Sequence, residues 1–89
     1  MIPLLGSDSR LVRRVLAGRP EAFEVLVLRY QKKAFAIARA LGVPASDLDD
    51  VVQDSFLQAF RDLASLESPS RFAAWFLQIV RNTACRSAP

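Results

Sequence analysis

The sequence predicts an all-α protein, folded as a compact bundle of about four helices. Apolar residues recur at helical spacing through four segments, and no segment alternates with period two for long. Helix-starting and helix-stopping residues separate these segments. With 89 residues, 52% of them hydrophobic, the chain is too apolar for disorder and long enough for one small core. We therefore expect a single domain over residues 1–89.

The first two helices are predicted over residues 9–16 and 20–41. Ser7 stands where it can cap the first helix, and Gly18 follows its last apolar residue. Pro20 suits the first position of the second helix, because its fixed φ is already helical and its missing N–H is not needed there. The second helix should be the longest rod of the molecule.

The third and fourth helices are predicted over residues 46–63 and 71–86. Gly42 should end the preceding helix in a left-handed conformation. Ser46, with Asp49 three residues later, is expected to form an acidic variant of the capping box. The short connections between the segments favour helices that pack against their neighbours in the chain.

Several kinds of function are excluded by the residue types present. Histidine is absent, which removes histidine-based nucleophile systems and the commonest general base. The one cysteine, Cys85, can form neither an internal disulfide nor a zinc site by itself. The longest unbroken apolar stretch, residues 72–77, is far shorter than the roughly 20 residues of a membrane span. We expect a cytoplasmic protein without cofactor, membrane span or enzymatic activity.

Charge is distributed in three bands along the chain. Residues 1–41 carry eight basic and three acidic side chains, a net charge of +5. Residues 42–66 carry one basic and five acidic side chains, a net charge of −4, and residues 67–89 return to +2. Such bands fit two partners, a polyanion and a basic surface, but solvated helix faces would produce them too.

The helix predicted at 46–63 has two contrasting faces. A core face is expected to hold Leu48, Val52, Phe56, Ala59, Phe60 and Leu63. The opposite face holds Asp47, Asp50, Asp54 and Arg61, with Leu57 among them and Gln53 on a flank. A leucine within a stripe of carboxylates fits a docking surface for a basic helix, whereas the aspartates alone also fit a solvated face. The aspartates lack a histidine or a second carboxylate helix that would complete a metal site.

The helix predicted at 71–86 also has more than a core face. Phe72, Phe76, Ile79, Val80 and Thr83 should point inward. Trp75 lies at the edge of this inward face, in line with Gln78, Asn82 and Arg86. An aromatic ring, two amides and a guanidinium could stack on, pair with and hold an unpaired nucleotide strand. The alternative is a tryptophan at the edge of the core among ordinary surface residues.

Three strings occur in order along the chain: EAFEVL at 21–26, DDVVQDSFL at 49–57, and FAAWF at 72–76 followed by RNTA at 81–84. Together they resemble region two of the extracytoplasmic-function group of bacterial sigma factors. The resemblance implies a domain that docks on the clamp helices of the largest RNA polymerase subunit and that recognises and melts the promoter minus-ten element at transcription initiation.

The resemblance also implies roles for individual residues. Polymerase contacts are expected at Asp50, Gln53, Asp54 and Leu57. Contacts to the non-template strand are expected at Arg71, Trp75, Gln78, Arg81, Asn82 and Arg86. The loop at 65–70 would match the one that catches a flipped base. An alternative is a helical interaction module, bound by an anti-sigma factor or another regulator, that does not read DNA.

The chain departs from the family after the helix at 71–86. It ends at Pro89 without the second domain, region four, which in the family reads the minus-thirty-five element. We expect the chain to be one excised domain of a longer factor; the alternative is a chain that relies on a partner for that contact.

Overall fold

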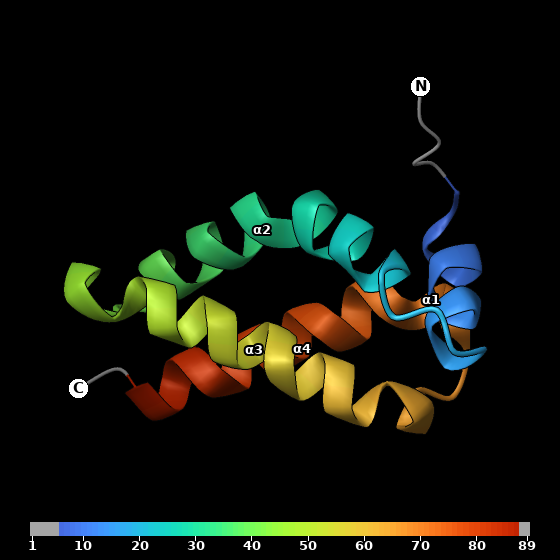
Figure 1. Ribbon diagram of the computed structural model, residues 1–89. Helices are drawn as coiled ribbons and strands as arrows, with labels where there is room; N and C mark the ends of the chain where they lie inside the picture. Colours follow the sequence, from blue (N-terminus) through green and yellow to red (C-terminus); the bar gives the residue numbers. More distant parts are fainter. Residues whose placement is uncertain (1–5, 88–89) are drawn as a thin grey trace.

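A computed structural model describes residues 6–87, and Figure 1 shows their arrangement. Within these residues the structure contains helices and no strand, which confirms the predicted all-α class. The four α-helices are α1 (Asp8–Leu16), α2 (Ala22–Ala40), α3 (Leu48–Asp62) and α4 (Phe72–Ser87). Three short 3₁₀ helices connect them: η1 (Ala45–Asp47), η2 (Leu63–Ser65) and η3 (Pro69–Arg71).

The three longer helices form the body of the molecule, and α1 covers one end of it (Figure 1). α3 packs against both α2 and α4. α1 packs against α2 and against η3, which leads into α4. The first helix therefore lies beside the connection between α3 and α4.

Aromatic rings fill the centre of the core. Phe76 of α4 is fully buried and stacks on Phe56 of α3, with ring centroids 4.5 Å apart. It also stacks on Phe72, at 5.7 Å, and contacts Tyr30 of α2 at 6.0 Å. Phe23 meets Phe56 edge to face at 6.4 Å. These contacts join three helices through one continuous cluster, as a small domain with one core requires.

The ends of the first two helices follow the predicted chemistry in part. The Ser7 hydroxyl oxygen accepts a hydrogen bond from the Arg10 N–H at 3.2 Å, so Ser7 caps α1. Pro20, however, is not the first residue of α2, which begins at Ala22. The N–H groups of Ala22 and Phe23 bond three residues back, to Arg19 and Pro20. A tight turn therefore precedes the α-helix, and the prediction at Pro20 is wrong by two residues.

The start of the third helix differs more clearly from the predicted one. The predicted capping box of Ser46 and Asp49 does not form, because Ser46 lies inside the 3₁₀ helix η1 and no side chain caps α3 at its N-terminus. Gly42 has φ +92°, as expected for a glycine that ends a helix. Its left-handed conformation redirects the chain so that Val43 is buried against α3.

The predicted core face of the third helix is confirmed except at Phe60, and the buried face is wider than predicted. Val51 and Ser55 are buried, and the Ser55 hydroxyl donates to the Val51 carbonyl oxygen at 2.8 Å. Phe60, expected in the core, is 43% exposed. Its ring meets Phe23 edge to face at 5.2 Å, so it covers the outside of the core. α3 packs against both α2 and α4, so its buried face is broader than one apolar stripe.

Candidate docking and nucleic-acid surfaces

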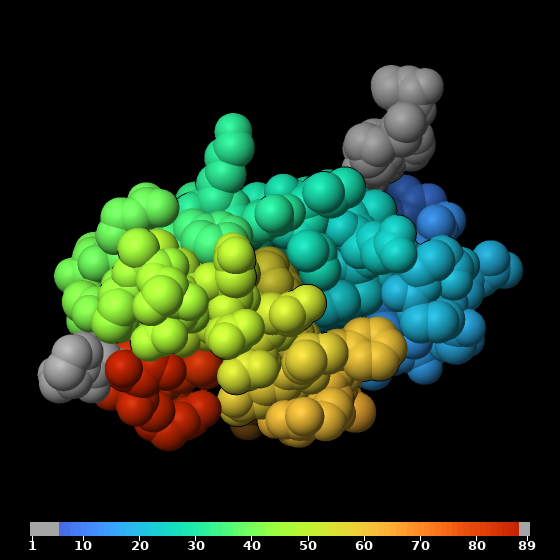
Figure 2. All heavy atoms as spheres, turned by 60° about the vertical axis from the view of Figure 1, so that its left-hand side comes forward, coloured from blue at the N-terminus to red at the C-terminus, as the bar shows by residue number. Residues whose placement is uncertain are grey.

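The predicted polymerase-contact residues form one surface on α3. Asp50, Gln53 and Asp54 are exposed, and Leu57 is 54% exposed between them and Arg61. The buried residues of α3 hold the helix by its other side, so this stripe faces outward. In Figure 2 the yellow atoms of α3 cross the visible face, with α2 above and the end of α4 below. We call this surface the α3 stripe.

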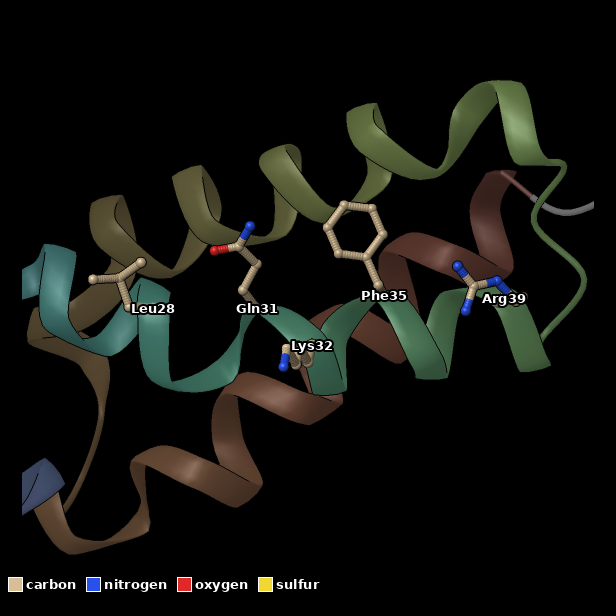
Figure 3. A pocket seen from close by; sticks show the side chains of 5 residues that line it. All are labelled: Leu28, Gln31, Lys32, Phe35 and Arg39. Carbon is tan, nitrogen blue, oxygen red and sulfur yellow. The ribbon is translucent and has the colours of Figure 1, made fainter.

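A groove runs along the edge of the α3 stripe, between α3 and α2. Its lining includes Gln53 and Asp49 of α3 with Gln31 and Phe35 of α2. Figure 3 shows Phe35 and Gln31 directed toward α3; both also line an adjoining pocket on α2 together with Lys32. Leu28 precedes them on the same helix and is 75% exposed. This part of α2 was not predicted from the sequence, although a leucine beside Arg29 and Lys32 breaks the polar face of the helix.

The α4 residues predicted to contact DNA form a second surface. Trp75 is half-buried and packs against the core, with its ring centroid 6.0 Å from that of Phe72. Gln78 and Asn82 are exposed, and the Gln78 side-chain amide donates to the Asn82 Oδ1 atom at 3.0 Å. Their spacing of four residues places these amides on one face of the helix. We call the line from Trp75 through Gln78 to Asn82 the α4 stripe.

The three arginines expected to contact the non-template strand are all exposed, but they lie in different places. Arg71 ends η3, and Arg81 lies further around α4 from the α4 stripe. The Arg86 Nη2 atom lies 3.5 Å from the Thr83 hydroxyl. Arg86 also lines a shallow recess with Asp54 and Leu57. The α3 stripe and the line of α4 that includes Arg86 therefore meet in the groove between the two helices.

The connection before α4 is short and held by local hydrogen bonds. The Ser65 hydroxyl donates to the Asp62 carbonyl oxygen at 2.7 Å, and the hydroxyls of Ser68 and Ser70 lie 3.0 Å apart. The Arg71 N–H bonds the Ser68 carbonyl oxygen at 2.8 Å, which closes η3. Much of this loop is open to solvent, and its serines present hydroxyls at the start of α4.

A polar cluster ties α1 to α2 near this loop. The Asp8 carboxylate accepts hydrogen bonds from Arg29 Nη1 at 2.9 Å and from the Tyr30 hydroxyl. Burial raises the pKa of Tyr30 to about 12, and the hydrogen bond to Asp8 and its negative charge act in the same direction. The phenol is therefore neutral at ordinary pH and donates to the carboxylate.

Two further properties concern the part of the chain that the structure describes. Residues 6–87 contain no group of three or more side chains of the kinds that could hold a metal ion. Among the described helices, none combines the length and apolar character needed to cross a membrane.

Comparison with known proteins assigns the family. Residues 26–88 match the family model of Sigma-70 region 2. The chain is 44% identical over 78 residues to the ECF RNA polymerase sigma-E factor of Salmonella typhimurium and 42% identical to that of Escherichia coli strain K12. Both alignments cover 88% of this chain and 40% of the relative. The chain belongs to the Sigma-70 region 2 family, and within it to the group of ECF sigma factors, as its residues had indicated.

Two solved structures share the fold. One is an engineered region 2 of sigmaE in complex with GTAAAA, at 40% identity and a TM-score of 0.84, covering 97% of this chain and 88% of that one. The other is CnrH in complex with the cytosolic domain of CnrY, at 35% identity and a TM-score of 0.84, covering 92% of this chain and 53% of that one. The chain spans about 40% of the length of the curated relatives it matches.

Proposed function

We propose that this domain docks on RNA polymerase through the α3 stripe and holds the unpaired non-template strand of the promoter minus-ten element on the α4 stripe. The observation that carries the proposal is the arrangement around Trp75. Its ring is anchored on Phe72 and partly open, beside two exposed amides. A fixed aromatic face can stack on an unpaired base, and amides can pair with base edges.

The relation to a solved structure supports binding of a nucleotide strand. The engineered region 2 that binds GTAAAA matches this chain over nearly its whole length. Stacking is worth about 1 to 3 kcal/mol per base, whereas unstacking a duplex step costs about a few kcal/mol. A domain of this size should therefore capture a strand that is already open, and polymerase must supply the rest of the melting energy.

Docking on polymerase is tested by charge reversal. Replacing both Asp50 and Asp54 with Lys should abolish binding to a fragment that contains the polymerase clamp helices, because the proposed partner of the α3 stripe is a basic helix and would meet like charges. The matched control reverses Glu21 and Asp62, two exposed acids outside the α3 stripe. Wild-type binding by the Asp50 and Asp54 variant would refute the docking surface.

DNA capture is tested on the same domain with a single-stranded GTAAAA oligonucleotide. The double substitution Trp75→Ala and Asn82→Ala should weaken binding, since it removes the stacking face and one amide. Arg13→Ala, on the exposed side of α1, is the control for a general loss of affinity. An unchanged titration curve for the double variant would remove the α4 stripe from the site.

A second candidate function is a protein-interaction module bound by a regulator. The likeness to CnrH, solved with the cytosolic domain of CnrY, favours it. The half-exposed Leu57 and the groove between α2 and α3 offer apolar contacts for such a partner. The two functions are compatible, and binding of a promoter oligonucleotide separates a domain that holds DNA from one that binds only protein.

A further inference from the structure

Helix α1 is too short to be stable by itself, yet it supports the region where α4 begins. It has nine residues, whereas isolated helices below about 12 to 15 residues are marginal in water. Leu11 and Val12 are buried in the main core. The helix packs against η3 and η2, the two turns that form the loop before α4. The position of this loop therefore depends on what holds α1.

Asp8 holds α1 by two bonds to the same neighbouring helix. Its two carboxylate oxygens accept from Arg29 and from Tyr30, which are adjacent residues of α2. Hydrogen bonds that involve an ionised partner are roughly twice as strong as neutral ones. Tyr30 is only 8% exposed, so its hydroxyl would lose its protein partner in a largely buried place if the carboxylate were removed. The chain has no other tyrosine.

Tyr30 connects the hydrogen bonds at Asp8 to the α4 stripe through ring contacts. Its centroid lies 5.6 Å from that of Phe72, the first residue of α4. Phe72 is fully buried, and its ring contacts Trp75 at 6.0 Å. Asp8, Tyr30, Phe72 and Trp75 thus form an unbroken series of contacts from α1 to the proposed base-stacking surface. In a closely packed interior, a shift of one side chain displaces its neighbours, because no void is available to absorb it.

We propose that Asp8 is a positioning residue for DNA capture: it fixes the Tyr30 ring, Tyr30 fixes Phe72, and Phe72 sets the orientation in which Trp75 meets an unpaired base. This inference rests on the proposed function for its consequence in DNA binding. Its structural content, the control of Trp75 by Asp8, stands apart from that function. Asp8 itself acts without touching a nucleotide.

Replacing Asp8 separates a positioning role from a simple electrostatic effect, because the two predict opposite changes in oligonucleotide affinity. Replacing Asp8 with Ala removes a negative charge and releases the Arg29 guanidinium from its pairing with Asp8. Both changes make the domain more attractive to a phosphate backbone, so electrostatics alone predicts tighter binding of an oligonucleotide. Loss of positioning predicts weaker binding. The two explanations therefore differ in sign.

The experiment measures Trp75 directly, since it is the single tryptophan of the chain. Acrylamide quenching of its fluorescence and titration with single-stranded GTAAAA are recorded for wild type, Asp8→Ala and Asp8→Asn. In Asp8→Ala we expect easier quenching and an affinity lower by about fivefold, the low end of the coupling usual between distant sites. Asp8→Asn keeps an acceptor oxygen and should restore part of both values. Glu24→Gln, an exposed acid of α2, is the control for charge.

Each outcome decides the inference. Wild-type quenching in Asp8→Ala would overturn it, and so would an increase of the same size in Glu24→Gln. Wild-type affinity in Asp8→Ala, with wild-type protein that binds the oligonucleotide, would overturn the positioning role while leaving the proposed function intact. If the wild-type protein binds no oligonucleotide, the proposed DNA capture fails, and quenching alone still decides whether Asp8 controls Trp75. Should Asp8→Ala fail to fold, Asp8→Asn and Tyr30→Phe supply the same comparison.

Discussion

Tyr30 lies where burial and a carboxylate act together on one hydroxyl. Both raise its pKa, to about 12 against an ordinary value near 10. The contribution of this raised pKa to the stability of the folded state is complete below about pH 10, where the phenol is neutral in both the folded and the unfolded chain. That contribution is lost between about pH 10 and pH 12, because the unfolded chain ionises first.

Absorbance near 295 nm tests this residue alone, because Tyr30 is the only tyrosine. We expect a titration midpoint at about pH 12 in the folded protein. Asp8→Asn should lower the midpoint, since it removes the negative charge that opposes ionisation. A wild-type midpoint near 10 would contradict both the burial of the phenol and its bond to Asp8.

Phe60 and Phe76 show how differently two phenylalanines contribute. Phe76 is fully buried among three other rings, so Phe76→Ala should cost about 3 to 5 kcal/mol of unfolding free energy. Phe60 is 43% exposed and contacts the ring of Phe23, so Phe60→Ala should cost about 1 kcal/mol. Urea unfolding of both variants measures the difference. Equal losses would mean that Phe60 belongs to the core after all.

At the scale of elements, α3 combines a core face with an outward stripe. Leu57 is 54% exposed, so Leu57→Ala should change the unfolding free energy by no more than about 0.5 kcal/mol. The same change should weaken binding to the clamp-helix fragment by more than about 1 kcal/mol, as for an apolar anchor of an interface. Leu16→Ala, at a residue 50% exposed on α1, is the matched control. A docking affinity insensitive to Leu57 would leave the stripe without its apolar contact.

Helix existence was predictable from sequence because each apolar stripe has a helical period, and the four predicted segments overlap the four observed α-helices. Helix starts were less predictable, since they depend on local turns. Pro20 and Ser46 both carry the chemistry of a helix start, yet a tight turn and a 3₁₀ helix occupy those positions. The choice between such turns and an α-helix is made by packing of the following residues, which sequence spacing does not encode.

The candidate surfaces were predictable to a similar degree. Leu57 stood out because an apolar residue interrupts a run of acids, and the structure places it in solvent. The position of Arg86 beside Asp54 and Leu57 was not predictable, because it depends on how α3 and α4 pack. The bonds from Asp8 to Arg29 and Tyr30 were missed for the same reason. These partners are 21 and 22 positions away along the chain, and they meet Asp8 only once α1 has packed on α2.

At the scale of the whole molecule, the proposed function divides between neighbouring helices. The α3 stripe is the acidic side that would meet polymerase, and α4 presents the tryptophan and amides that would meet DNA. Arg86, which follows Asn82 along α4, lines a recess with Asp54 and Leu57 of the α3 stripe, so docking and strand capture would occur on neighbouring helices. Helix α1, through Asp8, would fix the orientation of Trp75 on the DNA-binding surface.

The central claim is that Trp75 captures an unpaired base. Titrating the wild-type domain with GTAAAA, first as a single strand and then within a duplex of the same sequence, tests it most directly through Trp75 fluorescence. Base capture by Trp75 predicts that the single strand changes the fluorescence and binds more tightly than the duplex, because only unpaired bases expose a face for stacking. Equal affinity for the two forms, or binding that leaves Trp75 fluorescence unchanged, would contradict it.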